Sequence, residues 1–189
     1  HLQYGGSSLF TGLDTSLRYQ PGSDRSCNPY YQLAVQHQDF HRENRLDGLE
    51  SKASLGVSCP PFGYEGRQQI SVDLSRINNL ASDSGRLGGD RAGWQSNLSW
   101  QYTLRTASLR AQLSHTDIED KQGYSPLLKV GAARSIKRSY LLLQYRRPVH
   151  FLGASANFMI NLYHQRQRSN LELFRSKDTS AAMGFGWLF

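Results

Sequence analysis

The feature that most constrains this chain is a two-residue alternation of apolar and polar side chains that recurs in nine segments. In residues 93–104, "GWQSNLSWQYTL", Trp94, Leu98 and Trp100 share one parity while polar side chains take the other. Successive side chains of a β-strand point to opposite faces, so this period predicts strands with one apolar and one polar face. No segment sustains a helical period with caps, so we expect an all-β chain. The nine segments are 9–20, 30–38, 49–59, 69–75, 93–104, 108–116, 139–146, 152–163 and 179–189.

Alternation alone does not say which face of the strands meets water. A soluble β-sandwich or lipocalin-like barrel would turn the apolar faces inward, whereas an outer-membrane barrel turns them toward lipid. Polar faces rich in Gln, Asn, Ser and Arg, aromatic residues at strand ends, and alternating connection lengths favour the outer-membrane barrel. We therefore expect an antiparallel transmembrane β-barrel in a bacterial outer membrane, with outer-membrane lipid around it. The short connections are 105–107 and 147–151, and the long polar ones are 41–48, 78–93, 117–138 and 164–179.

The chain ends on "TSAAMGFGWLF", where it is most apolar. Phe185, Trp187 and Phe189 share a face, and this ending resembles the C-terminal signature by which the barrel-assembly machinery recognises outer-membrane barrels. If Phe189 lies at the periplasmic end, counting back places His1 outside the cell, although bacterial single-chain barrels have an even number of strands. We therefore interpret residues 1–189 as a single β-barrel region, the C-terminal part of a longer protein with further strands before His1.

The two cysteines provide a check on this arrangement. Cys27 opens the second predicted strand and Cys59 closes the third, at the same end and on the same face. Antiparallel pairing would bring them together, and the periplasm permits disulfides. The sequence therefore predicts a Cys27–Cys59 bridge, the alternative being two unpaired cysteines at the rim. No CxxC or HxxH spacing occurs, so no metal site is predicted.

Four basic residues fall on predicted polar faces: Arg18, Lys52, Arg110 and Arg146. One interpretation is a polar network that fills the barrel. Another is a cation-lined passage or plug-binding surface that favours acidic cargo. The net charge of +7 could also suggest nucleic acid, but the basic residues are scattered along the chain, so we expect no nucleic-acid partner.

A barrel hydrolase is the enzymatic alternative. Lipid A deacylases carry His-x-Ser-Asn near the last loop, where His activates Ser, and this chain has Ser169-Asn170 with Gln167 in the place of the His. In "LSHTD", Ser114 and His115 point to opposite faces of one predicted strand. Because the general base is missing from its required position, we predict no catalytic residues, and we predict no cofactor.

The closing stretch "QRQRSNLELFRSKDTSAAMGFGWLF" resembles the C-terminal barrel of the surface lipoprotein assembly modifier family. Those barrels have Ser-Asn in the last outer loop, then an aromatic and basic segment, then an alternating strand that ends in Phe. Residues 41–57, "HRENRLDGLESKASLGV", are similar to the Arg-x-x-(aromatic)-Asp-Gly loop of the same barrels, with Leu46 at the aromatic position. Polysaccharide-export barrels that follow helical repeats end similarly. The matching residues of the closing stretch are Ser169, Asn170, Phe174, Arg175 and Phe189.

The resemblance implies an export or translocation barrel that moves a surface lipoprotein, another protein or a polysaccharide across the outer membrane. It also implies a periplasmic delivery partner, or an N-terminal tetratricopeptide domain of the same chain, located before His1 together with further strands. A general diffusion porin is the first alternative function, and a small outer-membrane barrel hydrolase that acts on lipid is the second.

Overall fold

The computed structural model describes residues 3–4, 7–8, 10–21, 27–40, 46–60, 68–125, 127–128, 131–151 and 154–187. The described part of the chain is all-β apart from short 3-10 turns such as η3. No helix in this part is long and apolar enough to cross a membrane. The elements are β1 (Gln3–Tyr4), β2 (Ser7–Ser8), β3 (Phe10–Tyr19), β4 (Asn28–Phe40), β5 (Gly48–Cys59), β6 (Gln68–Ala81), β7 (Arg91–Leu104), β8 (Ala107–Gly123), β9 (Ala133–Phe151), β10 (Ala154–Ser169), η3 (Glu172–Phe174) and β11 (Ser176–Trp187).

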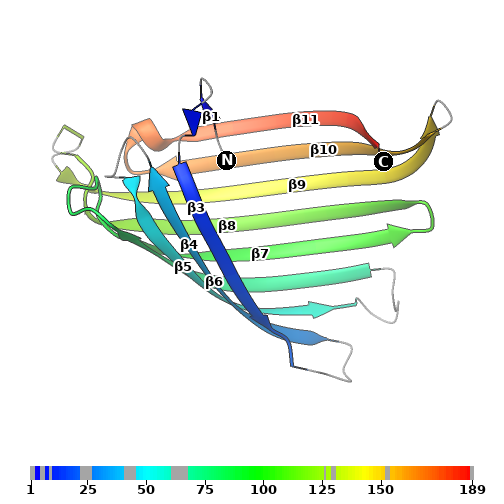
Figure 1. The fold of residues 1–189 in the computed structure, drawn as a ribbon, viewed down its shortest axis with the longest axis horizontal. Coiled ribbons are helices and arrows are strands. Elements are labelled where there is room, and N and C mark those ends of the chain that lie inside the picture. The colour runs from blue at the N-terminus through cyan, green and yellow to red at the C-terminus, as the bar shows by residue number, and fades with distance from the viewer. Residues whose placement is uncertain are drawn as a thin grey trace.

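Nine of the strands, β3 to β11, form one antiparallel sheet in which each strand pairs with its neighbours in sequence. The strand direction turns steadily across the sheet, from nearly horizontal at β11 to steeply inclined at β3 (Figure 1). Right-handed strand twist, added up over many strands, gives this curl. The sheet is not closed, because β3 and β11 are its two ends in the described residues. The predicted nine alternating segments are therefore confirmed as one sheet.

The strands at the C-terminal side are longer than the sequence predicted. Much of the predicted loops 117–138 and 164–179 is strand, since β8 continues to Gly123 and β10 to Ser169. The segment 147–151, expected to be a turn, lies within β9, and the β9–β10 connection is 152–153. Charged residues such as Asp117 and Lys137 sit opposite one another in the ladder, and their cross-strand pairing carries the strands through a stretch whose polarity had suggested loops.

The predicted alternation of connection lengths is therefore only partly present. We call the end of the sheet with the connections 20–27, 60–67, 105–106 and 152–153 the turn end, and the opposite end, with 41–47, 82–90, 124–132 and 170–175, the loop end. Two connections at the turn end are tight, but 20–27 and 60–67 are as long as those at the loop end. Length alone therefore does not distinguish the two ends of the sheet.

The two faces of the sheet carry the side chains that alternation assigned to them. The register places Leu113 opposite Leu141 and Leu143 opposite Leu162, on the face that we call the apolar face. These four leucines remain between 38% and 49% exposed. The other face, which we call the polar face, contains Ser75, whose side chain is fully buried. Exposed leucines on one face and a buried serine on the other are the reverse of the usual pattern in a water-soluble domain.

Hydrogen bonds across the polar face show how it is filled. Lys52 Nζ donates to Gln95 Oε1 at 2.7 Å, which reaches from β5 past β6 to β7. The Tyr30 hydroxyl donates to Asp73 Oδ1 at 3.3 Å, from β4 to β6, and the Tyr30 ring lies where a Cβ on Gly56 would collide with it. Bonds that skip a strand require the sheet to curve toward this face. The polar face is thus the inner face of the curled sheet.

Candidate functional site: the polar face of the sheet

The candidate site is the polar face, because all four basic residues singled out from the sequence lie on it. Arg18 pairs with Gln32, Lys52 with Ala34, Arg110 with Gln144, and Arg146 with Ser108, and all of these positions share the polar parity. Their roles differ. The Arg18 guanidinium lies 3.9 Å from the centre of the Tyr30 ring, and Lys52 is bound to Gln95. Each of these two cations thus contacts a side chain that is itself bonded to another strand, Tyr30 to Asp73 and Gln95 to Ser114.

Arg110 and Arg146 are exposed, as Arg18 also is, but unlike Arg18 they stack on no aromatic ring among the described residues. They lie near the turn end, and the one bond that Arg110 makes in the described part of the chain is to Gln112 Oε1 at 3.3 Å. Further along the same face, Gln144 Nε2 donates to Asn161 Oδ1 at 2.9 Å. Uncharged amides therefore surround two solvated cations, and this half of the polar face could contact a hydrated anionic solute or chain.

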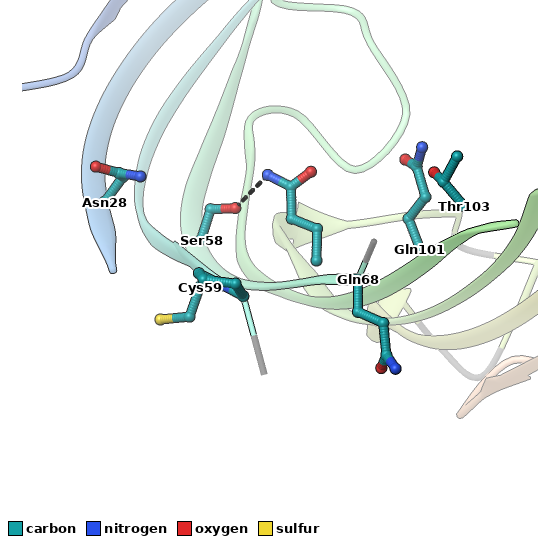
Figure 2. A pocket seen from close by; sticks show the side chains of 8 residues that line it. Asn28, Ser58, Cys59, Gln68, Gln101 and Thr103 are labelled. Carbon is teal, nitrogen blue, oxygen red and sulfur yellow. Dashed lines mark hydrogen bonds between the residues drawn. The ribbon is translucent and has the colours of Figure 1, made fainter. Parts of the chain in front are cut away.

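A small pocket of about 210 Å³ lies at the turn end. Figure 2 shows Asn28 on one side of it and Gln101 and Thr103 on the other. Ser58 Oγ accepts hydrogen bonds from Gln69 Nε2 at 2.6 Å and from Ser71 Oγ at 2.9 Å. Among the described residues, the lining consists of amides and hydroxyls together with Pro60 and the disulfide-bonded Cys59, so it offers hydrogen bonds but no charge.

The predicted Cys27–Cys59 disulfide is present beside this pocket. Asn28 pairs with Ser58 in the β4–β5 ladder, so the residues just beyond that pair meet at the turn end. Their Cα atoms are 4.2 Å apart. The bridge closes the ends of β4 and β5, as the sequence prediction required.

A cluster of charged residues that the sequence analysis missed lies at the loop end. Asp120, whose side chain is only 2% exposed, receives Arg134 through two nitrogens, with Nε 3.0 Å from Oδ2 and Nη2 3.1 Å from Oδ1. Arg91 Nε is 3.3 Å from Oδ1 of the same carboxylate. Arg134 also lies between two rings, 4.6 Å from the centre of Tyr124 and 4.5 Å from that of Phe174. Cation–π contact and a two-pronged ion pair together fix this guanidinium.

The connection 82–90 folds over this cluster and carries its third arginine, which is buried as Arg134 is. Arg86 is 7% exposed, and its Nη1 donates to Asn79 Oδ1 at 2.6 Å. Gly88 has a φ of +81° and sits against Asp120, where a Cβ would collide with the carboxylate. Burial lowers the pKa of the Arg86 guanidinium from its ordinary value, and nearby Arg134 lowers it further, while the carboxylate of Asp120 opposes the shift.

The charged residues of this cluster are visible in the sequence, but the polar stretches around them are typical of loops. Asp120 and Arg134 lie within the predicted connection 117–138, and Arg86 within the predicted connection 78–93. Once the predicted strands are extended to the bounds of β7 and β8, Asp120 and Arg91 become direct cross-strand partners. Paired opposite charges at the ends of adjacent predicted strands would have indicated both the longer strands and the cluster.

The predicted assembly signal and the Ser-Asn motif belong to the C-terminal part of the chain. Phe185 packs against Phe158 on the apolar face, with ring centres 5.3 Å apart. Phe189 and the side chain of Trp187 lie outside the described residues. Ser169 Oγ donates to Asn170 Oδ1 at 3.3 Å on the polar face, while His164, on the apolar face, is bonded to Thr179. The residues of the predicted Ser-Asn motif are therefore adjacent, and the nearest histidine in sequence faces the other way.

Ser114 and His115 also face opposite sides, as the strand period predicted. Gln95 Nε2 donates to Ser114 Oγ at 3.2 Å on the polar face, and His115 Nδ1 is 3.0 Å from Ser139 Oγ on the apolar face. Among the described residues, no three His, Cys, Asp or Glu side chains gather as metal ligands would.

The chain was compared with models of known families, with curated proteins and with solved structures, and none of them matches it.

Proposed function

We propose that this chain is part of the wall of an outer-membrane β-barrel, and that the barrel belongs to an export or translocation protein. The polar face would line the path of the cargo, and the apolar face would contact acyl chains. The sheet would close with strands outside the described residues. The observation that carries the proposal is the exposure of a continuous apolar face on a sheet whose buried side is polar.

The apolar face has a limited height, as a face in a bilayer should. Along β10, Phe158, Ile160 and Leu162 lie on it, and then the same parity changes to His164, Arg166 and Arg168. Along β8, the apolar row from Ala107 to Leu113 gives way to His115, Asp117 and Glu119. Seven residues of strand cover roughly 23 Å along the strand, or about 16–19 Å along the membrane normal at a tilt of about 35–45°, which lies within the apolar band of about 25 Å of outer-membrane barrels. The change to charge at the loop end agrees with a membrane boundary there.

The exposed leucines of this face are difficult to reconcile with a free surface in water. Soluble monomers rarely expose contiguous apolar patches larger than a few hundred Å². Leu55, Leu74, Leu98 and Leu113 come from four consecutive strands and are each 44% to 56% exposed. A lipid environment satisfies such a face without a second layer of protein, because the backbone groups are already paired within the sheet.

The export hypothesis rests on the resemblance of the closing stretch to surface lipoprotein assembly modifiers. In the closing stretch of this chain, Ser169-Asn170 is followed by Phe174 and Arg175. In this chain Arg175 Nε donates to Ser169 O at 2.8 Å, which ties the two halves of that stretch together. A diffusion porin is the second candidate, favoured by the two exposed cations Arg110 and Arg146 among amides.

Disruption of the gene separates the two functions. In a strain that lacks the protein, the export hypothesis predicts that the cell surface loses lipoproteins or other proteins that protease can reach, or loses polysaccharide. The wild-type gene should restore what is lost. A porin predicts slower uptake of small solutes with surface macromolecules unchanged. Unaltered surface display would contradict the export proposal, and unaltered permeability would contradict the porin.

A further inference from the structure

Besides the polar path itself, the loop end holds a second and more specific site, and its argument does not depend on the proposed function. A cavity of about 130 Å³ lies there on the polar face. Three arginines, Arg91, Arg134 and Arg138, line it together with Glu50, Asn79 and Thr116. Three isoleucines from β6, β8 and β9 provide an apolar floor. We call this cavity the arginine pocket.

The arginine pocket has more positive than negative charge. Arg86 lies behind the lining residue Asn79, which accepts from Arg86 Nη1 and donates to Glu50 Oε2 at 3.3 Å. Among the described residues in and next to the pocket, four arginines therefore stand against two carboxylates, Glu50 and Asp120. Asp90 adds nothing to the balance because it is paired with Lys121 at 3.3 Å. The excess is equivalent to the charge of one dianion.

A second observation is a buried donor without an acceptor. Arg86 is more than nine-tenths buried, and its Nε finds no hydrogen-bond partner among the described residues. A buried charged donor left unpaired costs free energy. The cost falls when an acceptor with several oxygens enters, and guanidinium forks match the geometry of phosphate oxygens.

We propose that the arginine pocket binds a phosphate group as its dianion. Arg91, Arg138 and the Arg86–Asn79 pair would hold the oxygens, and the Thr116 hydroxyl would provide a further donor. The isoleucine floor would contact the body of the molecule that carries the phosphate. That molecule could be a soluble phosphate ester or the phosphorylated headgroup of a glycolipid.

The test is calorimetry of inorganic phosphate with the full chain in phosphate-free detergent micelles. The key pair of variants is Arg138→Gln and Lys137→Gln, neighbours on opposite faces of β9, because Lys137 only pairs with Asp117 on the apolar face at 3.2 Å. We expect Arg138→Gln to weaken phosphate binding by roughly tenfold or more, as loss of a charged hydrogen bond does. Lys137→Gln should change it less than twofold.

Arg86→Gln is the second variant, and it should weaken binding similarly. A thermal melt without phosphate shows whether the Arg86→Gln chain folds. If that chain does not fold, the affinity of the Arg138→Gln chain decides the test. Absence of phosphate binding in the wild-type chain, equal affinity in Arg138→Gln, or equal affinity for acetate would overturn the proposal. Displacement of phosphate by a phosphorylated glycolipid in mixed micelles identifies a headgroup as the source, and failure of that displacement identifies a soluble ester, both within the proposed chemistry.

Discussion

Neighbouring residues of β8 lie in opposite environments. On the polar face Ser114 and Asp120 are 6% exposed and are bonded to side chains of adjacent strands, whereas Leu113, next to Ser114, is 49% exposed. In a soluble sheet the leucine would be buried and the serine would meet water. The side-chain interactions that stabilise this sheet from within are therefore mainly between polar groups. Its apolar face contributes free energy only if something other than water covers it.

The largest expected effect comes from removing the most buried charge. Asp120→Asn leaves Arg134 and Arg91 without their carboxylate, and breaking a buried ion pair from one side costs about 3–5 kcal/mol. Asp117→Asn, on the apolar face of the same strand, breaks an exposed pair with Lys137 and should cost less than about 1 kcal/mol. Denaturant unfolding in lipid or detergent measures both. Equal losses would mean that the polar face is not the inner one.

Next in size is a charge placed on the apolar face. Leu143→Arg should destabilise the chain in a bilayer by about 2–4 kcal/mol, because a cation would then lie in the hydrocarbon. Gln144→Arg, one residue along and on the polar face, is the matched control and should have a small effect. The comparison uses unfolding in lipid vesicles. A larger loss for Gln144→Arg would reverse the assignment of the two faces.

The disulfide should have an effect of comparable or smaller size. The double change Cys27→Ser with Cys59→Ser removes a crosslink between residues that are 32 positions apart, so the unfolded chain gains freedom. We expect the free energy of unfolding to fall by about 2–4 kcal/mol. The wild-type chain treated with a reductant should match the variant. If neither treatment lowers stability, the β4–β5 ladder alone holds the turn end.

The smallest effect concerns pH at the loop end. The Ala81 N–H donates to Asp90 Oδ1 at 3.0 Å and, with Lys121, lowers the pKa of this carboxyl below its ordinary value. A carboxyl whose pKa is lower in the folded state stabilises the fold above its unfolded pKa, and this contribution is lost as pH falls through the folded value. Asp90→Asn should therefore reduce the loss of stability between neutral pH and about pH 3, by under about 1 kcal/mol. Parallel pH profiles for both chains would exclude this role.

The sequence predicted the strands and their faces because the period of alternation is local. It also predicted the Cys27–Cys59 bridge, since antiparallel pairing fixes which ends meet. It missed the strand extensions at the loop end, where Asp117 and Lys137 read as loop residues although they pair across β8 and β9. It missed the arginine pocket for the same reason, because Arg91 and Asp120 become neighbours only through the register of extended strands.

The central claim is that the apolar face meets acyl chains and the polar face does not. Two single-tryptophan chains test it, both in vesicles whose acyl chains carry bromine as a fluorescence quencher. One retains Trp100 and has the other two tryptophans changed to Phe, and the other has all three changed to Phe together with Gln101→Trp on the opposite face. We predict strong quenching for Trp100 and little for the Gln101→Trp chain. Equal quenching, or none at Trp100, would contradict the claim.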